Sequence, residues 1–287
     1  MRVSPPILAR PMRPAFLLSL VLLLSACDSV QNFDTPAPPP QPGDPIPGIA
    51  FEAGMEWTYS WSDEDYVVSE GSGEADSLVR RDAFELTARV VSVDAEVEGE
   101  RGLVRIDTDS YENGRRCRAD WFRVSGAFIE HVASAPGRDD GYIPPVLTTY
   151  RNLSSPSYTC GTEPQHVWRF EDHERPIYPT PALVGVEWEW PSINYATGDT
   201  TLVTGLSVVG LGATRVPAGT FATAQVRRTY STDEEGEYGT EQLMEAYDYV
   251  STDGLVLRED VWTGDGPWGE SRERSVRRLE LLEVRRP

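Results

Sequence analysis

The residues that could carry chemistry are few and widely separated in this chain of 287 residues. The cysteines are Cys27, Cys117 and Cys160, and the histidines are His131, His166 and His173. These side chains are common nucleophiles, general bases and ligands of transition metals. Their spacing matches no strong catalytic or zinc-binding motif, so we expect no catalytic residue and no cofactor.

Searches for sequence motifs point the same way. "GLSVVG" (205–210) is not the G-x-S-x-G elbow of a hydrolase, and "GLGATR" (210–215) lacks the third glycine of a dinucleotide site. Carboxylate pairs of the glycosidase kind cannot be recognised among 46 acidic residues. An enzyme therefore rests on no specific residue, and an extracytoplasmic hydrolase is the least favoured alternative.

Two segments have ligand-like composition without ligand-like spacing. His166 and His173 lie among several carboxylates, but their separation fits no strong metal motif. "DTDSYENG" (107–114) resembles a calcium loop, but Tyr111 stands where a third oxygen ligand belongs. We expect a metal at neither segment.

The charge is strongly negative. All 26 basic residues are arginine, and residues 1–26 hold three of them and no acid, so the remaining chain has a net charge of 23 − 46 = −23. Such a charge repels nucleic acids and anionic lipid surfaces, so neither is an expected partner. A solvated acidic coat explains it more simply than a cation-binding surface does.

The first 26 residues have the composition of a secretory signal. A basic, proline-containing stretch (1–14) precedes the apolar run Ala15–Ala26, which has 12 residues. A membrane-spanning helix needs about 20 residues, so the run is too short to span and suits the core of a signal peptide.

The end of this run resembles the lipobox of bacterial lipoproteins: Leu24-Ser25-Ala26-Cys27. The resemblance implies cleavage after Ala26 and a Cys27 that carries acyl chains such as palmitate. Two or more chains give stable anchoring to a membrane. It also implies the cell envelope, with the outer membrane favoured over the inner one and the domain facing the periplasm or the exterior. A cleaved signal with a chance cysteine is the alternative.

A proline-rich stretch separates this anchor from the rest of the chain. Seven prolines lie between Thr35 and Pro47, a composition that favours an extended spacer over a folded core. We therefore divide the chain into a signal peptide (1–26), a lipidated cysteine with its tether (27–48) and a globular domain (49–287).

Alternation of apolar and polar residues dominates the domain and predicts a mainly β fold. Met55, Trp57, Tyr59 and Trp61 alternate with polar residues, and the pattern returns in "LVGVEWEW". Further strands are expected at 84–93, 102–107, 121–124, 128–132, 201–209, 221–230, 243–250, 255–262 and 275–284. With turn-like segments between them, they predict a single curved antiparallel sheet or a partly closed barrel, with little helix.

Once Cys27 is assigned to the anchor, two cysteines remain. Outside the cytoplasm Cys117 and Cys160 are expected to form a disulfide, and two free thiols or a metal pair are the alternatives. The disulfide would fasten the proline-rich stretch around 135–160 to the strand near Trp121.

The aromatic residues are the best lead to a binding surface. Trp57, Tyr59, Trp61, Trp188 and Trp190 are expected on one face of the sheet. They form either the core or a concave surface that holds an acyl chain or stacks on a sugar.

"RVPAGTF" (215–221) and "EAYDYVSTDGLVLRE" (245–259) together resemble a pair of segments in uncharacterised exported bacterial β-sheet families. "PALVGVEWEW" and "GMEWTYSW" resemble other strands of these families, and the likeness covers about 120 residues. It implies a curved sheet distantly like that of lipoprotein carriers, and no activity. "STDGLV" replaces the usual Pro-Gly turn, and the middle segment has no counterpart.

These observations predict a noncatalytic, lipid-anchored envelope protein. Its partners are the membrane, through the anchor, and an unknown small ligand or envelope protein on the curved sheet. A structural lipoprotein that acts as a docking module in assembly is the alternative.

Overall fold

In the computed structural model, residues 45–68, 77–110, 116–136, 163–164, 167–169, 175–193, 200–231, 243–265 and 272–287 are described. All of them belong to the compact unit Pro39–Pro287. They contain strands and turns, and none of them lies in a helix. It follows that the described residues include no helix long and apolar enough to cross a membrane.

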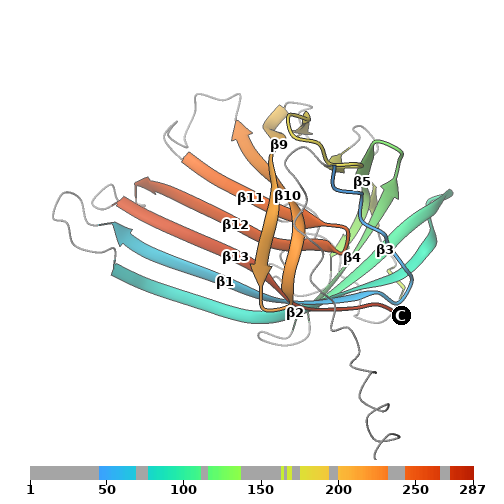
Figure 1. Ribbon diagram of the computed structural model, residues 1–287, viewed down its shortest axis with the longest axis horizontal. Coiled ribbons are helices and arrows are strands. Elements are labelled where there is room, and N and C mark those ends of the chain that lie inside the picture. The colour runs from blue at the N-terminus through green and yellow to red at the C-terminus, as the bar shows by residue number, and fades with distance from the viewer. Residues whose placement is uncertain are drawn as a thin grey trace, which may run out of the picture. The chain divides into compact units, whose positions relative to one another are not determined.

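The unit is one antiparallel sheet (Figure 1). Its strands in the first half are β1 (Glu56–Val68), β2 (Ser77–Val97), β3 (Glu100–Ser110), β4 (Arg116–Val124), β5 (Phe128–Pro136), β6 (Trp168–Arg169) and β7 (Pro176–Pro179). Those in the second half are β8 (Glu187–Ile193), β9 (Thr200–Val216), β10 (Gly219–Ser231), β11 (Leu243–Ser251), β12 (Gly254–Asp265) and β13 (Arg272–Arg285).

The order of the strands joins the two halves of the chain through the first and last strands. The path runs β6-β5-β4-β3-β2-β1-β13-β12-β11-β10-β9-β8, and β7 pairs with β5 beside it. Most neighbours are therefore also consecutive in sequence, as in an up-and-down barrel. The predicted fold class is confirmed: the described part of the chain is all β, with a curved sheet that nearly closes into a barrel.

The alternation read from the sequence determines which face is buried. Trp57, Tyr59 and Trp61 on β1 are buried, and the residues between them are half-buried. Tyr59 pairs with Leu281 of β13 and with Leu86 of β2, so apolar side chains of three strands meet on the inner face. This face, with its neighbours on the other strands, holds the main core.

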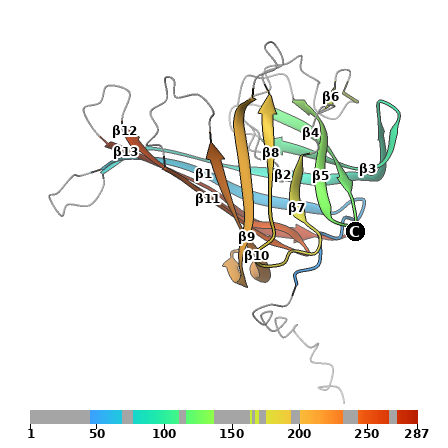
Figure 2. The same ribbon diagram turned by 90° about the horizontal axis from the view of Figure 1, so that it is seen from above.

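β7 brings the two ends of the path together. It pairs with β5 through Ile129 and Tyr178, and Trp188 of β8 donates its indole N–H to the carbonyl of Pro176 at 2.9 Å. Figure 2 shows β7 between β5 and β8. The sequence did not predict β7, because its prolines are typical of loops; proline is accommodated here because β7 lies at an edge.

The observed strands extend beyond the expected limits at several points. β2 has 21 residues and β9 has 17, against the predicted ranges 84–93 and 201–209. The added part of β2 includes Arg80, Arg81 and Asp82, which are exposed or half-buried. A strand with solvent on both faces has no apolar alternation, so the pattern underestimates its length.

The "VPAGTF" segment forms the tight connection that its proline and glycine predict. β9 ends at Val216, Pro217 and Ala218 form the turn, and β10 begins at Gly219. Gly219 has a positive φ of 139°, a conformation that glycine adopts without strain.

The described chain starts and ends at the same side of the sheet. Ile46 pairs with Ala182, and the carboxylate of Glu52 binds the guanidinium of Arg286 at 2.8 Å. Ile46 and Ile49 are both buried in the main core. Residues 1–44 lie outside the described residues, so the division into signal, tether and domain stays a prediction.

A second, smaller core lies on the outer face of β3–β5. It includes Leu103, Cys117 and Trp121, with Val167 packed against them. The expected disulfide has one cysteine here and the other, Cys160, outside the described residues, so this pairing stays a prediction.

Candidate functional site

The structure places four of the five aromatic side chains singled out in the sequence in the main core. Trp57, Tyr59, Trp61 and Trp190 have exposed fractions of 1%, 0%, 8% and 6%. Trp188 is half-buried and packs against the same core. Of the two alternatives for these residues, the structure supports the core.

The polar atoms of Trp57 and Tyr59 are paired within the protein. The indole N–H of Trp57 donates to the Asp253 carbonyl at 2.5 Å, and the Tyr59 hydroxyl donates to the Leu255 carbonyl at 2.9 Å. Burial raises the pKa of Tyr59 well above its ordinary value. Trp61 stacks on Phe84 with ring centroids 4.7 Å apart. Trp57, Tyr59 and Trp61 are therefore part of the packed core.

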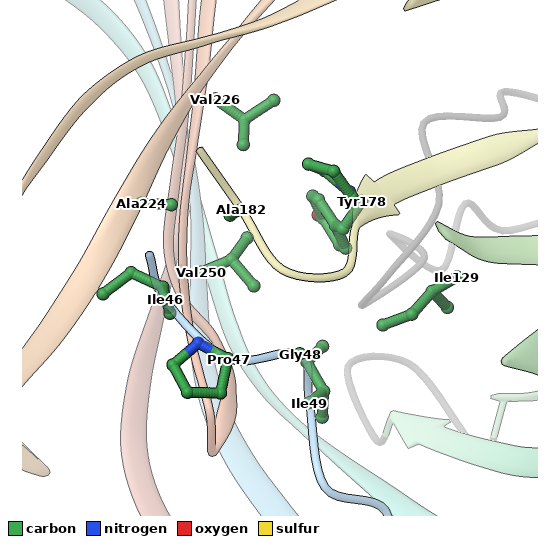
Figure 3. Close-up of a pocket in the computed structure, with 11 residues that line it drawn as sticks. Ile46, Pro47, Gly48, Ile49, Ile129, Tyr178, Ala182, Ala224, Val226 and Val250 are labelled. Atoms are coloured by element: carbon green, nitrogen blue, oxygen red, sulfur yellow. The ribbon is translucent and has the colours of Figure 1, made fainter. Parts of the chain in front are cut away.

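A pocket lined by described residues is apolar and very small (Figure 3). Its volume is about 10 Å³, close to the minimum that holds a single water molecule. It lies between the entering segment Ile46–Ile49, Tyr178 of β7 and Val250 of β11. The cavity is therefore a packing defect under the entering chain and is too small for an acyl chain.

Next to this core lies a buried ionic cluster, which we name the Asp248 cluster: Tyr178, Arg228, Asp248, Arg258 and Asp260. The Asp248 side chain is completely buried. Its Oδ1 lies 2.7 Å from Arg258 Nε and 3.1 Å from Arg228 Nη2, and its Oδ2 accepts the Tyr178 hydroxyl at 2.7 Å. Arg228 also binds Asp260 at 2.5 Å.

The electrostatics of the Asp248 cluster keep its ions charged. Burial raises the pKa of Asp248, but Arg228 and Arg258 outweigh it, so this pKa lies below its ordinary value. Burial and the neighbouring Asp248 raise the pKa of Tyr178 well above its ordinary value. The cluster is therefore two arginines against two aspartates, with Tyr178 as a neutral donor.

A second buried polar group lies on β4 and β5. Asp120 accepts hydrogen bonds from Arg118 Nε at 2.7 Å and from the Ser134 hydroxyl at 2.7 Å, and it contacts His131 Nε2 at 3.0 Å. Burial raises the pKa of Asp120, but Arg118 and His131 lower it below its ordinary value. Burial lowers the pKa of His131, and the contact with Asp120 only partly offsets this.

The second group does not have the geometry of a catalytic triad. The carboxylate of Asp120 stands between Ser134 and His131, so the serine hydroxyl donates to the acid and not to the imidazole. A nucleophilic serine requires the imidazole as its base. His131, with an exposed fraction of 3%, is held as a core residue.

From Asp63 of β1 onwards, the inner face of the sheet is more exposed to solvent. Asp82, Asp63, Arg277 and Asp260 lie in one register row across β2, β1, β13 and β12, which we name the charged row. Their side chains are 34%, 14%, 31% and 20% exposed. Figure 1 shows these four strands running on side by side as one layer towards the left of the view.

Each carboxylate of the charged row binds an arginine: Asp82 binds Arg80, Asp63 binds Arg277 and Asp260 binds Arg228. Arg277 Nε binds Asp63 at 3.1 Å, and the Ser275 hydroxyl donates to the other oxygen of Asp63 at 3.1 Å. Half-buried Trp262 pairs with Ser275 in the next row. Carboxylates accept hydrogen bonds from hydroxyl and ammonium groups, and an indole stacks on a sugar ring. The charged row and Trp262 are the best candidate for a binding surface.

Sequence reasoning missed both the Asp248 cluster and the charged row. The available signal was a charged residue at a core-facing position: Asp248 stands between Ala246 and Val250 in the alternation, and Arg258 follows Val256. Asp63 likewise continues the series of Trp57, Tyr59 and Trp61.

The remaining site predictions fall largely outside the described residues. Cys27, Cys160, His166 and His173 lie there, so no structural statement concerns them. Asp107, at the start of the calcium-like segment, binds Arg105 at 2.8 Å. Within the described ranges, no group of three or more His, Cys, Asp or Glu side chains could hold a metal ion.

Comparison with known proteins gives little further guidance. No protein-family model matches the chain, and no curated protein is similar to it. The resemblance to exported β-sheet families therefore stays a prediction.

Two solved structures are similar at a low level. One, from Bacteroides fragilis, is described as an exported protein with a YmcC-like fold; the match has 12% identity and a TM-score of 0.29 and covers 85% of this chain and 100% of that chain. The other, from Parabacteroides distasonis, is described as a lipoprotein, with 12% identity, a TM-score of 0.32 and coverage of 84% and 100%. Similarity this weak carries no argument about function.

Proposed function

We propose that this chain is a lipid-anchored protein of the bacterial cell envelope that binds a ligand and does not catalyse a reaction. The observation that carries the proposal is the Leu24-Ser25-Ala26-Cys27 sequence after a short apolar run. Ile46 pairs with Ala182 of the domain, and a short proline-rich stretch precedes it in the sequence. Acylated Cys27 would hold this domain at the membrane surface.

The buried polar groups favour binding over catalysis, because they are paired with one another inside the protein. The ions of the Asp248 cluster pair with one another, and Asp120 is occupied by Arg118, Ser134 and His131. The carboxylates of the charged row are also paired with arginines, but they are 14–34% exposed, so a ligand can reach them. The chemistry of the charged row suits a ligand with hydroxyl groups, such as a glycan, that stacks on Trp262.

The anchoring part is tested by expressing the full chain with its signal in a bacterium and replacing Cys27. Wild-type protein should incorporate labelled palmitate and sediment with membranes, and Cys27→Ala should do neither. Palmitate-free wild-type protein in the soluble fraction would overturn the anchoring.

The binding part is tested by native mass spectrometry of the detergent-solubilised protein with envelope glycan fragments. We expect an adduct that is lost in Trp262→Ala and kept in Tyr247→Ala, a change of a half-buried aromatic on the outer face of neighbouring β11. An adduct that both variants keep would place binding elsewhere, and the lack of any adduct with wild-type protein would remove the glycan proposal.

A further inference from the structure

Exposed apolar side chains gather where the chain enters the sheet. Leu183, Val184 and Val209 are 41%, 53% and 45% exposed. The amide of Gly185 donates to the carbonyl of Val208 at 2.9 Å, so Val184 and Val209 directly flank a bonded pair. We name these three residues the entry patch.

The entry patch is fixed to the point where the proposed anchor joins the domain. Ile46 and Ala182 exchange two backbone hydrogen bonds, of 3.1 and 2.9 Å, and Leu183 follows Ala182 directly. The surrounding segment Pro181–Val186 contains no charged residue in a strongly acidic chain. The place where the proposed tether would join the domain therefore also carries exposed apolar side chains.

We infer that the entry patch contacts the lipid surface to which Cys27 is anchored, so that this end of the sheet faces the membrane. The inference rests on the proposed anchoring. Residues 28–46 separate Cys27 from the patch, and 19 residues span at most roughly 60–70 Å when extended. A short tether raises the effective concentration of the patch at the bilayer, so a small apolar area suffices for contact.

The negative charge of the domain determines which lipid headgroups the entry patch is expected to contact. The exposed Glu187 and Glu189 follow the patch on β8, and the chain as a whole is acidic. Anionic headgroups repel such a surface and zwitterionic headgroups do not. The patch is therefore expected to contact phosphatidylethanolamine or phosphatidylcholine in preference to phosphatidylglycerol.

The chain carries a matched control of the same chemistry. Leu78 and Val79 at the start of β2 are 50% and 66% exposed. Leu78 pairs with Tyr66 of β1, whereas Val208, next to Val209, lies in the register row of Trp61. Five residues of strand, roughly 17 Å, and the five strands between β2 and β9 therefore separate the two positions. The lipid contact predicted for the entry patch should not extend to Leu78 and Val79.

The experiment reconstitutes the full lipidated protein in phosphatidylcholine–phosphatidylethanolamine vesicles that contain a photoreactive phospholipid. After illumination, mass spectrometry should find several-fold more lipid adducts on peptides with Leu183 and Val184 than on peptides with Leu78 and Val79. The variant L183S/V184S should lose most of this lipid labelling while Cys27 is still acylated, and the control L78S/V79S should keep it. Adding phosphatidylglycerol to the vesicles should reduce the labelling of the wild-type protein.

Three results would overturn the inference. The first is equal lipid labelling of the entry patch and of Leu78 and Val79. The second is lipid labelling of the entry patch that grows with the density of protein in the vesicle, and the third is protection of the amides of residues 181–187 from hydrogen exchange that is the same in detergent and in vesicles. The second would indicate contact with another copy of the chain, and the third that the chain's own residues 28–44 cover the patch. A failed anchor is recognised separately, because Cys27 would then lack acyl mass and the protein would not bind vesicles.

Discussion

Asp248 lies fully buried between two arginines, and this arrangement has a direct consequence for stability. Replacing it by alanine leaves Arg228 and Arg258 without their shared partner inside the sheet. Breaking a buried ion pair in this way costs about 3–5 kcal/mol. We expect Asp248→Ala to lower the free energy of unfolding by this amount in urea denaturation.

The matched control for Asp248→Ala is Glu283→Gln. Glu283 binds Arg285, and the two side chains are 50% and 62% exposed. Solvent screens an exposed pair, so Glu283→Gln should change the free energy of unfolding far less than Asp248→Ala does. Equal effects of the two substitutions would contradict the structural role given to the Asp248 cluster.

His131 predicts a dependence of stability on pH. Its pKa is lowered by burial, so the unfolded chain binds a proton at a higher pH than the folded chain does. Stability contributed by neutral His131 is therefore present above the ordinary histidine pKa of about 6.5 and is lost as pH falls below it, by at most about 1.4 kcal/mol per pH unit.

The His131 prediction is measured as the free energy of unfolding between pH 7.5 and 5.5, in wild type and in His131→Gln. The slope of the variant should be smaller, although its stability at pH 7.5 is also lower. An unchanged slope would show that other groups dominate this range. The lowered pKa of Asp120 adds a further loss only at more acidic pH, as that carboxylate protonates.

At the scale of the elements, the turn between β11 and β12 is sensitive to substitution. Gly254 has a φ of 113°, and a Cβ at this residue would lie 2.9 Å from Trp57 Nε1. Gly254→Ala combines backbone strain of about 1–3 kcal/mol with displacement of a core indole. We expect thermal unfolding to show a clear loss of stability.

Gly212→Ala provides the control for Gly254→Ala. Gly212 lies within β9, has no positive φ, and would meet no atom within 4 Å on gaining a Cβ. Its midpoint of thermal unfolding should stay close to that of wild type. A similar loss in both variants would argue against the close approach of the β11–β12 turn to Trp57.

The sequence predicts the elements well where one face of a strand is apolar. Trp57, Tyr59 and Trp61 defined β1 and its buried side, and Pro217 with Gly219 defined the β9–β10 turn. It predicts poorly where a strand has two solvated faces, as at the start of β2, or contains prolines, as in β7. The charged row was also missed, because cross-strand register, and not spacing along the chain, brings Asp63 and Asp260 to the same arginine.

At the scale of the whole molecule, the proposed anchor and a disulfide would together account for all three cysteines. Cys117 is buried in the smaller core on β4, and we expect it to pair with Cys160. Non-reducing peptide mapping should recover one linked pair of peptides, and Cys117→Ser/Cys160→Ser should be less stable by roughly 2–5 kcal/mol. A linked peptide that contains Cys27 would contradict both this pairing and the anchor.

The central claim is that Cys27 anchors the acidic β domain to a membrane. Intact-mass spectrometry of the full protein extracted from membranes tests it most directly. The account predicts a mature chain that starts at Cys27 and carries the mass of a diacylglycerol and of a third acyl chain. A mature chain that starts at any other residue, or an unmodified Cys27, would contradict it.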